Sequence, residues 1–164
     1  MAKPIPDGYH TVTPYLIIRD AAKAMDFYKN AFKAVETFRM DGPDGKIAHA
    51  EIRIGDSIIM LSDEHPQMGY NSPQSLGGSP AGIVLYVEDC DAVFNRAIEA
   101  GGIVKDSVTD KFYGDRSGSL ADPFGHIWHV TTHKEDVSPQ ELDRRLKEMF
   151  ATGQPSRSTS ERSS

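Results

Sequence analysis

Two histidines and a glutamate stand in a pattern that metal sites and acid–base sites both use. His49 and Glu51 are two residues apart in an expected strand, so their side chains would lie on one face of it. With His129 or His10 they would complete a set of two histidines and one carboxylate, which divalent metals favour. The alternative is an ordinary half-buried strand whose polar face carries His49, Glu51 and Arg53.

His126 and His129 show the limit that strand geometry sets on such a set. They are three residues apart in another expected strand, so their side chains point to opposite faces and cannot share one ion. Ile127 shares a face with His129, whereas Trp128 shares the opposite face with His126. We therefore expect Ile127 to accompany His129, and Trp128 to lie in the core beneath a helix.

Arg116 is the candidate for recognition of a charged group. A guanidinium at the mouth of a cleft binds anionic or carbonyl groups through a forked pair of hydrogen bonds. A surface ion pair with Asp115 or Asp122 is the alternative interpretation. The string Asp122-Pro123-Phe124-Gly125 itself indicates a tight turn, because proline fixes φ and glycine tolerates unusual backbone angles.

Hydrophobic periodicity indicates the elements that would position these side chains. Residues 11–18 are β-branched and aromatic, as in a strand, and Asp20 is typical of a helix N-cap. Apolar residues at helical spacing then continue to Phe32. Three further strands are expected at 35–40, 46–54 and 57–62. The first part of the chain therefore follows the order β-α-β-β-β.

The same order returns after residues 63–80, which are rich in Pro, Gly and Ser and indicate a loop. A strand at 82–87 and an N-cap at Asp89 open the second unit, and an offset of 69 residues aligns Asp20 with Asp89. The remaining strands are expected at 103–109, 112–121 and 126–132. We therefore predict an α+β fold of two βαβββ repeats, residues 8–62 and 81–132.

The end of the chain contains a helix signal followed by a polar tail. Ser138, Pro139 and Glu141 form a capping box with proline at the first helical position, which predicts a helix over 138–150. Residues 151–164 contain five serines and no large apolar side chain. We predict that they form a disordered tail.

The repeat resembles the vicinal oxygen chelate superfamily, which includes glyoxalase I, extradiol dioxygenases, and fosfomycin- and bleomycin-resistance proteins. Within it the chain is similar to the PhnB-like branch, over residues 8–135. The segments that carry this resemblance are TPYLIIRDAAKAMDFYKNAF, KIAHAEIRIGDSIIMLSDE and YGDRSGSLADPFGHIWHV. The resemblance implies a curved mixed sheet around a cleft, with two four-stranded halves flanking the cleft and the helices outside. It also implies a homodimer.

Metal-dependent members of that superfamily take ligands from the first and last strand of each unit. By the resemblance, these positions fall on Thr13, Met60, Gly82 and His129. Glycine has no side chain, a thioether suits only soft metals, and a threonine hydroxyl is a poor ligand. Only His129 is a good ligand, so we expect neither glyoxalase I nor dioxygenase chemistry, and no cofactor.

Strand alternation gives a set of side chains that would line the cleft without a metal. Tyr15, Met60 and Ile127 would form apolar walls, with Thr13 beside them. The residues expected to bind polar groups of a ligand are His49, Glu51, His129 and Arg116. A mostly apolar pocket with few polar groups is typical of small-molecule sites. The sequence thus favours metal-independent binding of a small, partly apolar ligand, as in sequestration-type resistance proteins.

Two other functions remain open at this stage. A divalent-metal lyase or isomerase of the glyoxalase type would use His49, Glu51 and His129 as a displaced ligand set. An interaction module would have a cleft filled by its own side chains. Metal analysis separates the first alternative from a binding protein, and the free volume of the cleft separates the second.

Composition excludes several partners. The 164 residues carry 24 acidic and 18 basic side chains, a net charge of −6, which argues against nucleic acid. The apolar stretches are too short to span a bilayer, so we expect no membrane partner. The single cysteine, Cys90, and the lack of an apolar leader in the first residues predict a cytoplasmic location.

Overall fold

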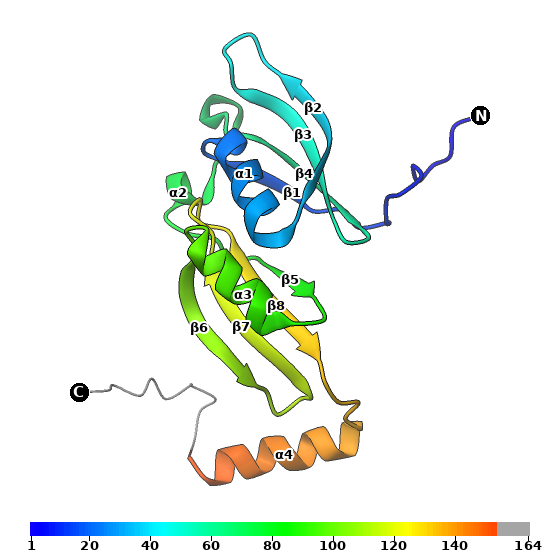
Figure 1. Cartoon of the computed structure of the whole chain (residues 1–164), viewed down its shortest axis with the longest axis vertical. Coiled ribbons are helices and arrows are strands. Elements are labelled where there is room, and N and C mark those ends of the chain that lie inside the picture. Colours follow the sequence, from blue (N-terminus) through cyan, green and yellow to red (C-terminus); the bar gives the residue numbers. More distant parts are fainter. Residues whose placement is uncertain (154–164) are drawn as a thin grey trace.

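The computed structural model describes residues 1–153 and contains the β-α-β-β-β order twice (Figure 1). Of the predicted tail 151–164, residues 154–164 lie outside the described residues. The first repeat comprises β1 (Tyr15–Ile18), α1 (Ala21–Phe32), β2 (Val35–Asp41), β3 (Ile47–Ile54) and β4 (Ser57–Asp63). The second comprises β5 (Gly82–Tyr86), α3 (Cys90–Glu99), β6 (Ile103–Asp110), β7 (Asp115–Ala121) and β8 (Ile127–His133). This order confirms the predicted fold class.

Each repeat forms its own four-stranded mixed sheet. The strand orders are β1-β4-β3-β2 and β5-β8-β7-β6, and the described strands close no barrel. The first and last strands of each repeat pair in parallel, whereas the other neighbours pair antiparallel. Parallel neighbours need a long connection, which α1, β2 and β3 supply in the first repeat and α3, β6 and β7 in the second. The identical topology reflects the repeat that the sequence indicated.

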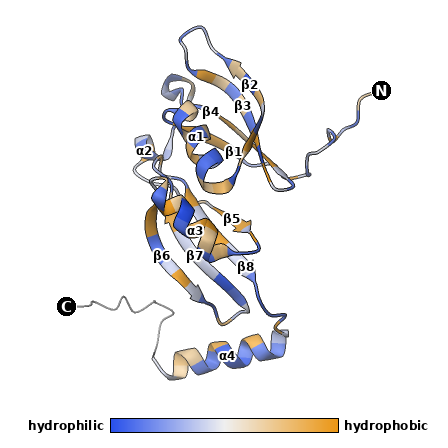
Figure 2. Ribbon diagram, in the orientation of Figure 1, coloured by the Kyte–Doolittle hydropathy of each residue, from blue (hydrophilic) through white to orange (hydrophobic). Residues whose placement is uncertain are grey.

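Three further helical segments lie outside the repeats. The 3-10 helix η1 (Pro66–Met68) and the short helix α2 (Pro73–Leu76) occupy the connection between the repeats. Helix α4 (Pro139–Ala151) follows β8, and its ribbon carries both hydrophilic and hydrophobic residues (Figure 2). The Ser138 hydroxyl accepts a hydrogen bond from the Glu141 amide at 3.2 Å, as the capping box predicted. None of the helices in residues 1–153 combines the length and apolar character needed to span a bilayer.

The two repeats meet through their helix-bearing faces. Helix α1 covers one face of the first sheet, α3 covers one face of the second, and the two helices contact each other. Helices α1 and α3 thus contact each other at the junction of the two repeats (the seam), whereas the resemblance implied helices on the outside. We call the face of each sheet that lies opposite its helix the open face (Figure 1).

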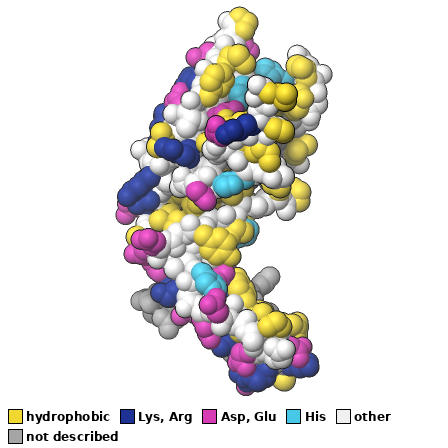
Figure 3. Space-filling view, turned by 90° about the vertical axis from the view of Figure 1, so that its right-hand side faces the viewer, with side chains coloured by type: hydrophobic (Ala, Val, Ile, Leu, Met, Phe, Trp, Pro, Cys, Tyr) yellow, Lys and Arg dark blue, Asp and Glu magenta, His cyan; other side chains and the backbone are white. Residues whose placement is uncertain are grey.

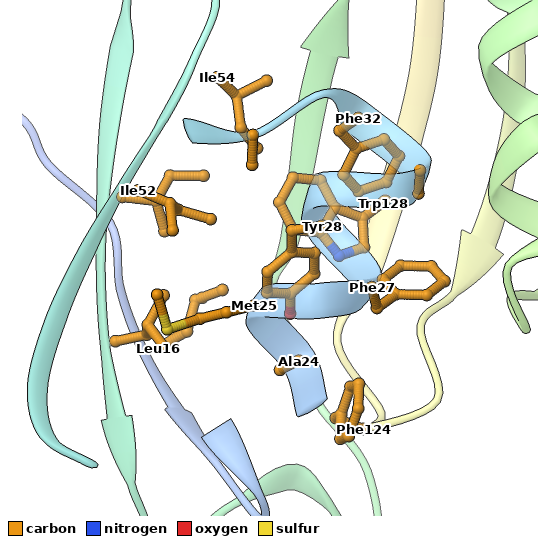
Figure 4. Close-up of a cluster of buried hydrophobic side chains, with 14 of the residues drawn as sticks. Leu16, Ala24, Met25, Phe27, Tyr28, Phe32, Ile52, Ile54, Phe124 and Trp128 are labelled. Carbon is orange, nitrogen blue, oxygen red and sulfur yellow. The ribbon is translucent and has the colours of Figure 1, made fainter. Parts of the chain in front are cut away.

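An aromatic cluster with a buried carboxylate holds the seam together. The Trp128 ring lies 4.6 Å from Phe32 and 5.2 Å from Tyr28, so residues of both repeats share one core (Figure 4). Asp122 accepts hydrogen bonds from the Tyr28 hydroxyl at 2.6 Å and from Trp128 Nε1 at 3.0 Å. Burial and the neighbouring Asp122 carboxylate raise the pKa of Tyr28 well above its usual value. Trp128 is thus core, as predicted.

The N-terminus of α1 is capped differently from the prediction. Asp20 has a left-handed backbone, with φ of 69°, and its side chain makes no cap hydrogen bond. The buried Asp63 carboxylate instead accepts from the Ala21 amide at 2.9 Å and from the Ile47 amide at 2.7 Å. In the second repeat Asp89 does cap its helix, accepting from the Ala92 amide at 3.0 Å.

Candidate functional site

The open face of the first sheet gathers four of the candidate residues. Along β3, Ala50 and Ile52 are fully buried, so His49 and Glu51 project from the open face. Met60 of β4 pairs with Tyr15 on one side and with Glu51 on the other. Strand register therefore places Tyr15, Glu51 and Met60 in one row, with His49 beside them.

Side-chain hydrogen bonds connect the polar members of this group. The Tyr15 hydroxyl lies 2.9 Å from His49 Nδ1, and His49 Nε2 lies 3.0 Å from Glu51 Oε1. The Tyr9 hydroxyl, from the segment before β1, donates to the other carboxylate oxygen of Glu51. Burial opposes ionisation of Glu51, but the bonds from Tyr9 and His49 outweigh it and lower its pKa. The group is a continuous polar chain rather than separate surface residues.

Apolar side chains surround this polar chain. The cross-strand partners of Glu51 and His49 on β2 are Phe38 and Met40, which lie on the same face and are about half exposed. The Phe38 ring lies 6.0 Å from the His49 ring. Apolar and His side chains are found together on the side of the molecule that Figure 3 shows. The first open face thus has the mixture of apolar surface and few polar groups that small-molecule sites use.

The open face of the second sheet carries a different group, centred on His129. Its Nδ1 lies 2.7 Å from the Ser119 hydroxyl, which the register places directly opposite on β7. Beside them, the hydroxyls of Ser117 and Thr131 are hydrogen bonded to each other at 2.8 Å. Ile127 shares this face with His129 and is partly buried. The sequence predicted the pairing of Ile127 with His129 but gave no role to Ser119, which strand register identifies.

The four inherited ligand positions do not fit a metal. Gly82 has no side chain, and a Cβ built there would lie 2.5 Å from His129 Nε2, so the imidazole occupies the space of a neighbouring ligand. Met60 lies on the first sheet among Tyr15 and Glu51. Thr13 precedes β1, where its hydroxyl donates to the His10 carbonyl at 3.2 Å. The donor set is therefore one imidazole, one thioether and one hydroxyl, on separate sheets and loops.

The alternative ligand set is divided in the same way. His49 and Glu51 are bound to each other on the first sheet, whereas His129 is bound to Ser119 on the second. Within residues 1–153, no three His, Cys, Asp or Glu side chains are placed to hold one ion. A single chain does not assemble His49, Glu51 and His129 as one metal site.

Arg116 lies on the helix-bearing face, not on an open face. Along β7 the residues Gly118 and Leu120 are buried under α3, and Arg116 shares their face. Its Nε and one terminal nitrogen donate to Asp91 of α3 at 2.7 and 2.9 Å, and Asp110 accepts a third bond. In this arrangement the forked side of the guanidinium is occupied by the Asp91 carboxylate. The ion-pair alternative was correct in kind, although its partners are Asp91 and Asp110.

A cavity of about 850 Å³ lies between the repeats, separate from both groups. Its lining includes Thr13, Ile58 and Val84, and residues from α1 and α3. None of the four candidates on the first open face, nor His129, belongs to that lining. Of the predicted candidate residues, Thr13 and His10 line this cavity. Val84 and Tyr86 of β5, which share the second open face with His129, also line it.

The comparisons with known proteins agree with this architecture. The family model described as "Glyoxalase/Bleomycin resistance protein/Dioxygenase superfamily" matches residues 9–130. The chain belongs to that superfamily. An uncharacterised protein of Mycobacterium tuberculosis is 48% identical over 134 residues, covering 80% of this chain and 79% of the relative.

Two solved structures illustrate the shared fold. Protein PA1353 from Pseudomonas aeruginosa has a TM-score of 0.63 at 25% identity, covering 77% of this chain and 99% of that one. A PhnB protein from Bacillus cereus, titled a putative 3-demethylubiquinone-9 3-methyltransferase, has a TM-score of 0.58 at 19% identity. That match covers 75% of this chain and 99% of the other. Helix α4 lies beyond the residues that the family model matches.

Proposed function

We propose that this protein is a metal-independent, sequestration-type binder of a small, partly apolar molecule, and that its site is completed by a second copy. In this arrangement the open face of the first sheet of one chain faces the open face of the second sheet of its partner. The observation that carries the proposal is the division of the candidate residues between two open faces. A homodimer brings Tyr15, His49 and Glu51 of one copy opposite His129 of the other.

Exposed apolar side chains on both open faces support a partner surface that packs against them. Tyr15 is 47% exposed and Met40 51% exposed on the first sheet, and Val84 is 53% and Tyr86 65% exposed on the second. Contiguous apolar surface of this kind is typical of interaction and ligand-binding sites. Two such faces brought together would bury it and enclose a cleft.

The chemistry of the donor set supports a metal-independent role. Gly82 offers no ligand, and the His129 imidazole lies over it. Hydrogen bonds from the hydroxyls and imidazoles of both faces would then orient the ligand, while Met60 and Ile127 contact its apolar part. A cytoplasmic location is part of the same proposal, since Cys90 is a single buried cysteine without a disulfide partner.

A thermal-shift panel of small, partly apolar molecules tests this function on untagged protein. We expect at least one compound to raise the melting temperature of the wild type, and Met60→Arg to abolish that shift by placing a charge on the first open face. Met68→Arg is the matched control, because Met68 is exposed in the connection between the repeats. Equal shifts in both variants would contradict the site.

Metal content is measured on the same untagged protein. The binding proposal predicts a metal content far below one ion per chain. Near-stoichiometric Zn, Ni, Mn or Fe that disappears in His129→Ala would instead favour the lyase or isomerase alternative. Sedimentation equilibrium supplies the mass, for which we expect a dimer; a monomer would contradict the two-copy site.

A further inference from the structure

The polar chain on the first open face has the order of an acid–base relay. We propose that Tyr15, His49 and Glu51 act together to take a proton from the bound molecule, with the Tyr15 phenol as the group that meets it. This would add proton-transfer chemistry to binding. The inference rests on the proposed function for its ligand, but the relay itself is a property of one chain.

The direction of the relay follows from its hydrogen bonds. Glu51 accepts from both Tyr9 and His49, and these bonds lower its pKa, so the carboxylate is ionised near neutral pH. An ionised carboxylate has no proton to donate, so His49 Nε2 carries the hydrogen of their bond. In the neutral imidazole Nδ1 then carries no hydrogen, so its lone pair accepts a hydrogen bond from the Tyr15 hydroxyl.

Exposure increases from one end of the relay to the other. The Glu51 side chain is 12% exposed and the His49 side chain 22%, whereas Tyr15 is 47% exposed. Tyr9 occupies the second oxygen of Glu51, so the carboxylate makes no other outward contact among the described bonds. The phenol is therefore the end of the chain that a ligand can reach, and Tyr9 is a positioning residue.

Few other charges face His49. On its own strand Glu51 and Arg53 share the open face, and β2 contributes Phe38 and Met40 across from Glu51 and His49. Strands β1 and β4 contribute Tyr15 and Met60 to this face, which are a phenol and a thioether rather than a carboxylate or an amine. Glu51 is thus the charge that contacts the imidazole, and it stabilises the imidazolium that proton transfer produces.

The proposed step balances without a co-reactant. An O–H bond of the ligand, or a C–H bond beside a carbonyl, breaks, and its electron pair stays on the ligand oxygen or carbon. The proton forms a bond to the Tyr15 oxygen while the original phenol proton moves to His49 Nδ1. The reverse transfer returns a proton to the ligand, at the same atom or at another.

An arylsulfonyl fluoride tests the relay without knowledge of the ligand. Benzenesulfonyl fluoride reacts with a phenol oxygen, forming an S–O bond as fluoride leaves, and needs the phenol proton to be accepted by a base. Tyr70, which is 52% exposed in the connection between the repeats, is the internal reference in the same molecule. We expect Tyr15 to be labelled at least about tenfold faster than Tyr70 by peptide mass spectrometry.

Two variants separate proton acceptance from a structural role. His49→Gln keeps a hydrogen-bond acceptor but cannot accept a proton, and Glu51→Gln removes the charge that stabilises the imidazolium. Both should bring the Tyr15 labelling rate to within about twofold of Tyr70.

The outcomes also separate this inference from the binding proposal. Equal labelling of Tyr15 and Tyr70 in the wild type, or an unchanged ratio in both variants, would overturn the relay. That result would leave the thermal-shift panel unaffected, because the labelling contains no ligand. Rapid labelling of Tyr15 in a protein that binds nothing in the panel would overturn the binding proposal and support the relay.

Discussion

The first sheet links the polar groups of its open face into one chain, from Tyr15 through His49 to Glu51, whereas His129 on the second sheet has Ser119 as its partner. Both sheets nevertheless have the same strand order and the same parallel pairing of first and last strands. Packing against α1 and α3 constrains the helix-bearing faces, since any change of volume there costs stability. The open faces lack this packing against α1 and α3, and their polar groups differ between the two repeats.

Asp122 is the residue whose loss should separate the two repeats most strongly. In Asp122→Ala the buried Tyr28 hydroxyl and Trp128 indole lose their shared acceptor, and two amides of the turn lose another. Unsatisfied buried donors are costly, so we expect a loss of about 3 to 5 kcal/mol in the free energy of unfolding, measured in urea.

Tyr28→Phe is the control for this prediction. It removes one donor to Asp122 and keeps the aromatic packing, so a loss of about 1 to 2 kcal/mol is expected. A similar small loss in Asp122→Ala would contradict the central role of Asp122 at the seam.

Glu64 and His133 occupy equivalent places, one repeat offset apart, and should respond to pH in opposite ways. Hydrogen bonds from Ser75, Arg19 and the Ser72 amide lower the pKa of Glu64 to about 2. Its contribution is therefore present above the usual glutamate pKa and is lost as pH falls towards 2. After screening by solvent we expect Glu64 to contribute about 1 to 2 kcal/mol to the free energy of unfolding. This contribution should be absent in Glu64→Gln.

The His133 effect has the opposite sign. Hydrogen bonds to Asp136 and Asp115 raise the pKa of His133, so its contribution is complete below the usual histidine pKa and is lost as pH rises through the raised value. Urea unfolding of the wild type and of His133→Gln between pH 5 and pH 9 measures this contribution. The free energy of unfolding of the two proteins should differ most at the acidic end of this range. A stability difference from the wild type that does not change over that range would contradict the assignment.

Gly82→Ala tests the second open face with the smallest expected change in stability. The added Cβ would displace the His129 imidazole and weaken its bond to Ser119, because the imidazole lies over Gly82. The side chain can move, so unfolding should change by less than about 1 kcal/mol. In NMR spectra of Gly82→Ala the imidazole resonances of His129 should shift relative to the wild type, while those of His49 should remain unchanged. Unchanged His129 resonances would contradict the close approach.

Much of the fold was predictable because each repeat contains strong local signals. Strand β3 was expected at 46–54 and is found at Ile47–Ile54, and β2 gained one residue. Strand β1 is shorter than the expected 11–18 because Pro14 has no N–H to donate, and pairing begins at Tyr15. Strand β7 begins at Asp115, not at residue 112, because Gly114 turns the chain with φ of 100°.

The site was predictable only in part, because it depends on contacts between distant segments. Alternation correctly placed His49 with Glu51, and His129 with Ile127. The same alternation, read from the buried Leu120, would have put Arg116 under α3. Tyr9 has no periodic signal, since it lies before the first strand, and its bond to Glu51 depends on how the N-terminal segment crosses the sheet. The packing of helix against helix at the seam was likewise absent from the local pattern.

Complementation between two defective chains tests the two-copy site most directly. His49→Ala damages the first open face and His129→Ala damages the second, so either homodimer should fail to bind a compound from the panel. In a coexpressed heterodimer one of the two clefts contains both intact faces, and binding should return to about half of the wild-type capacity. Binding that stays absent in the heterodimer would contradict a site shared between two copies.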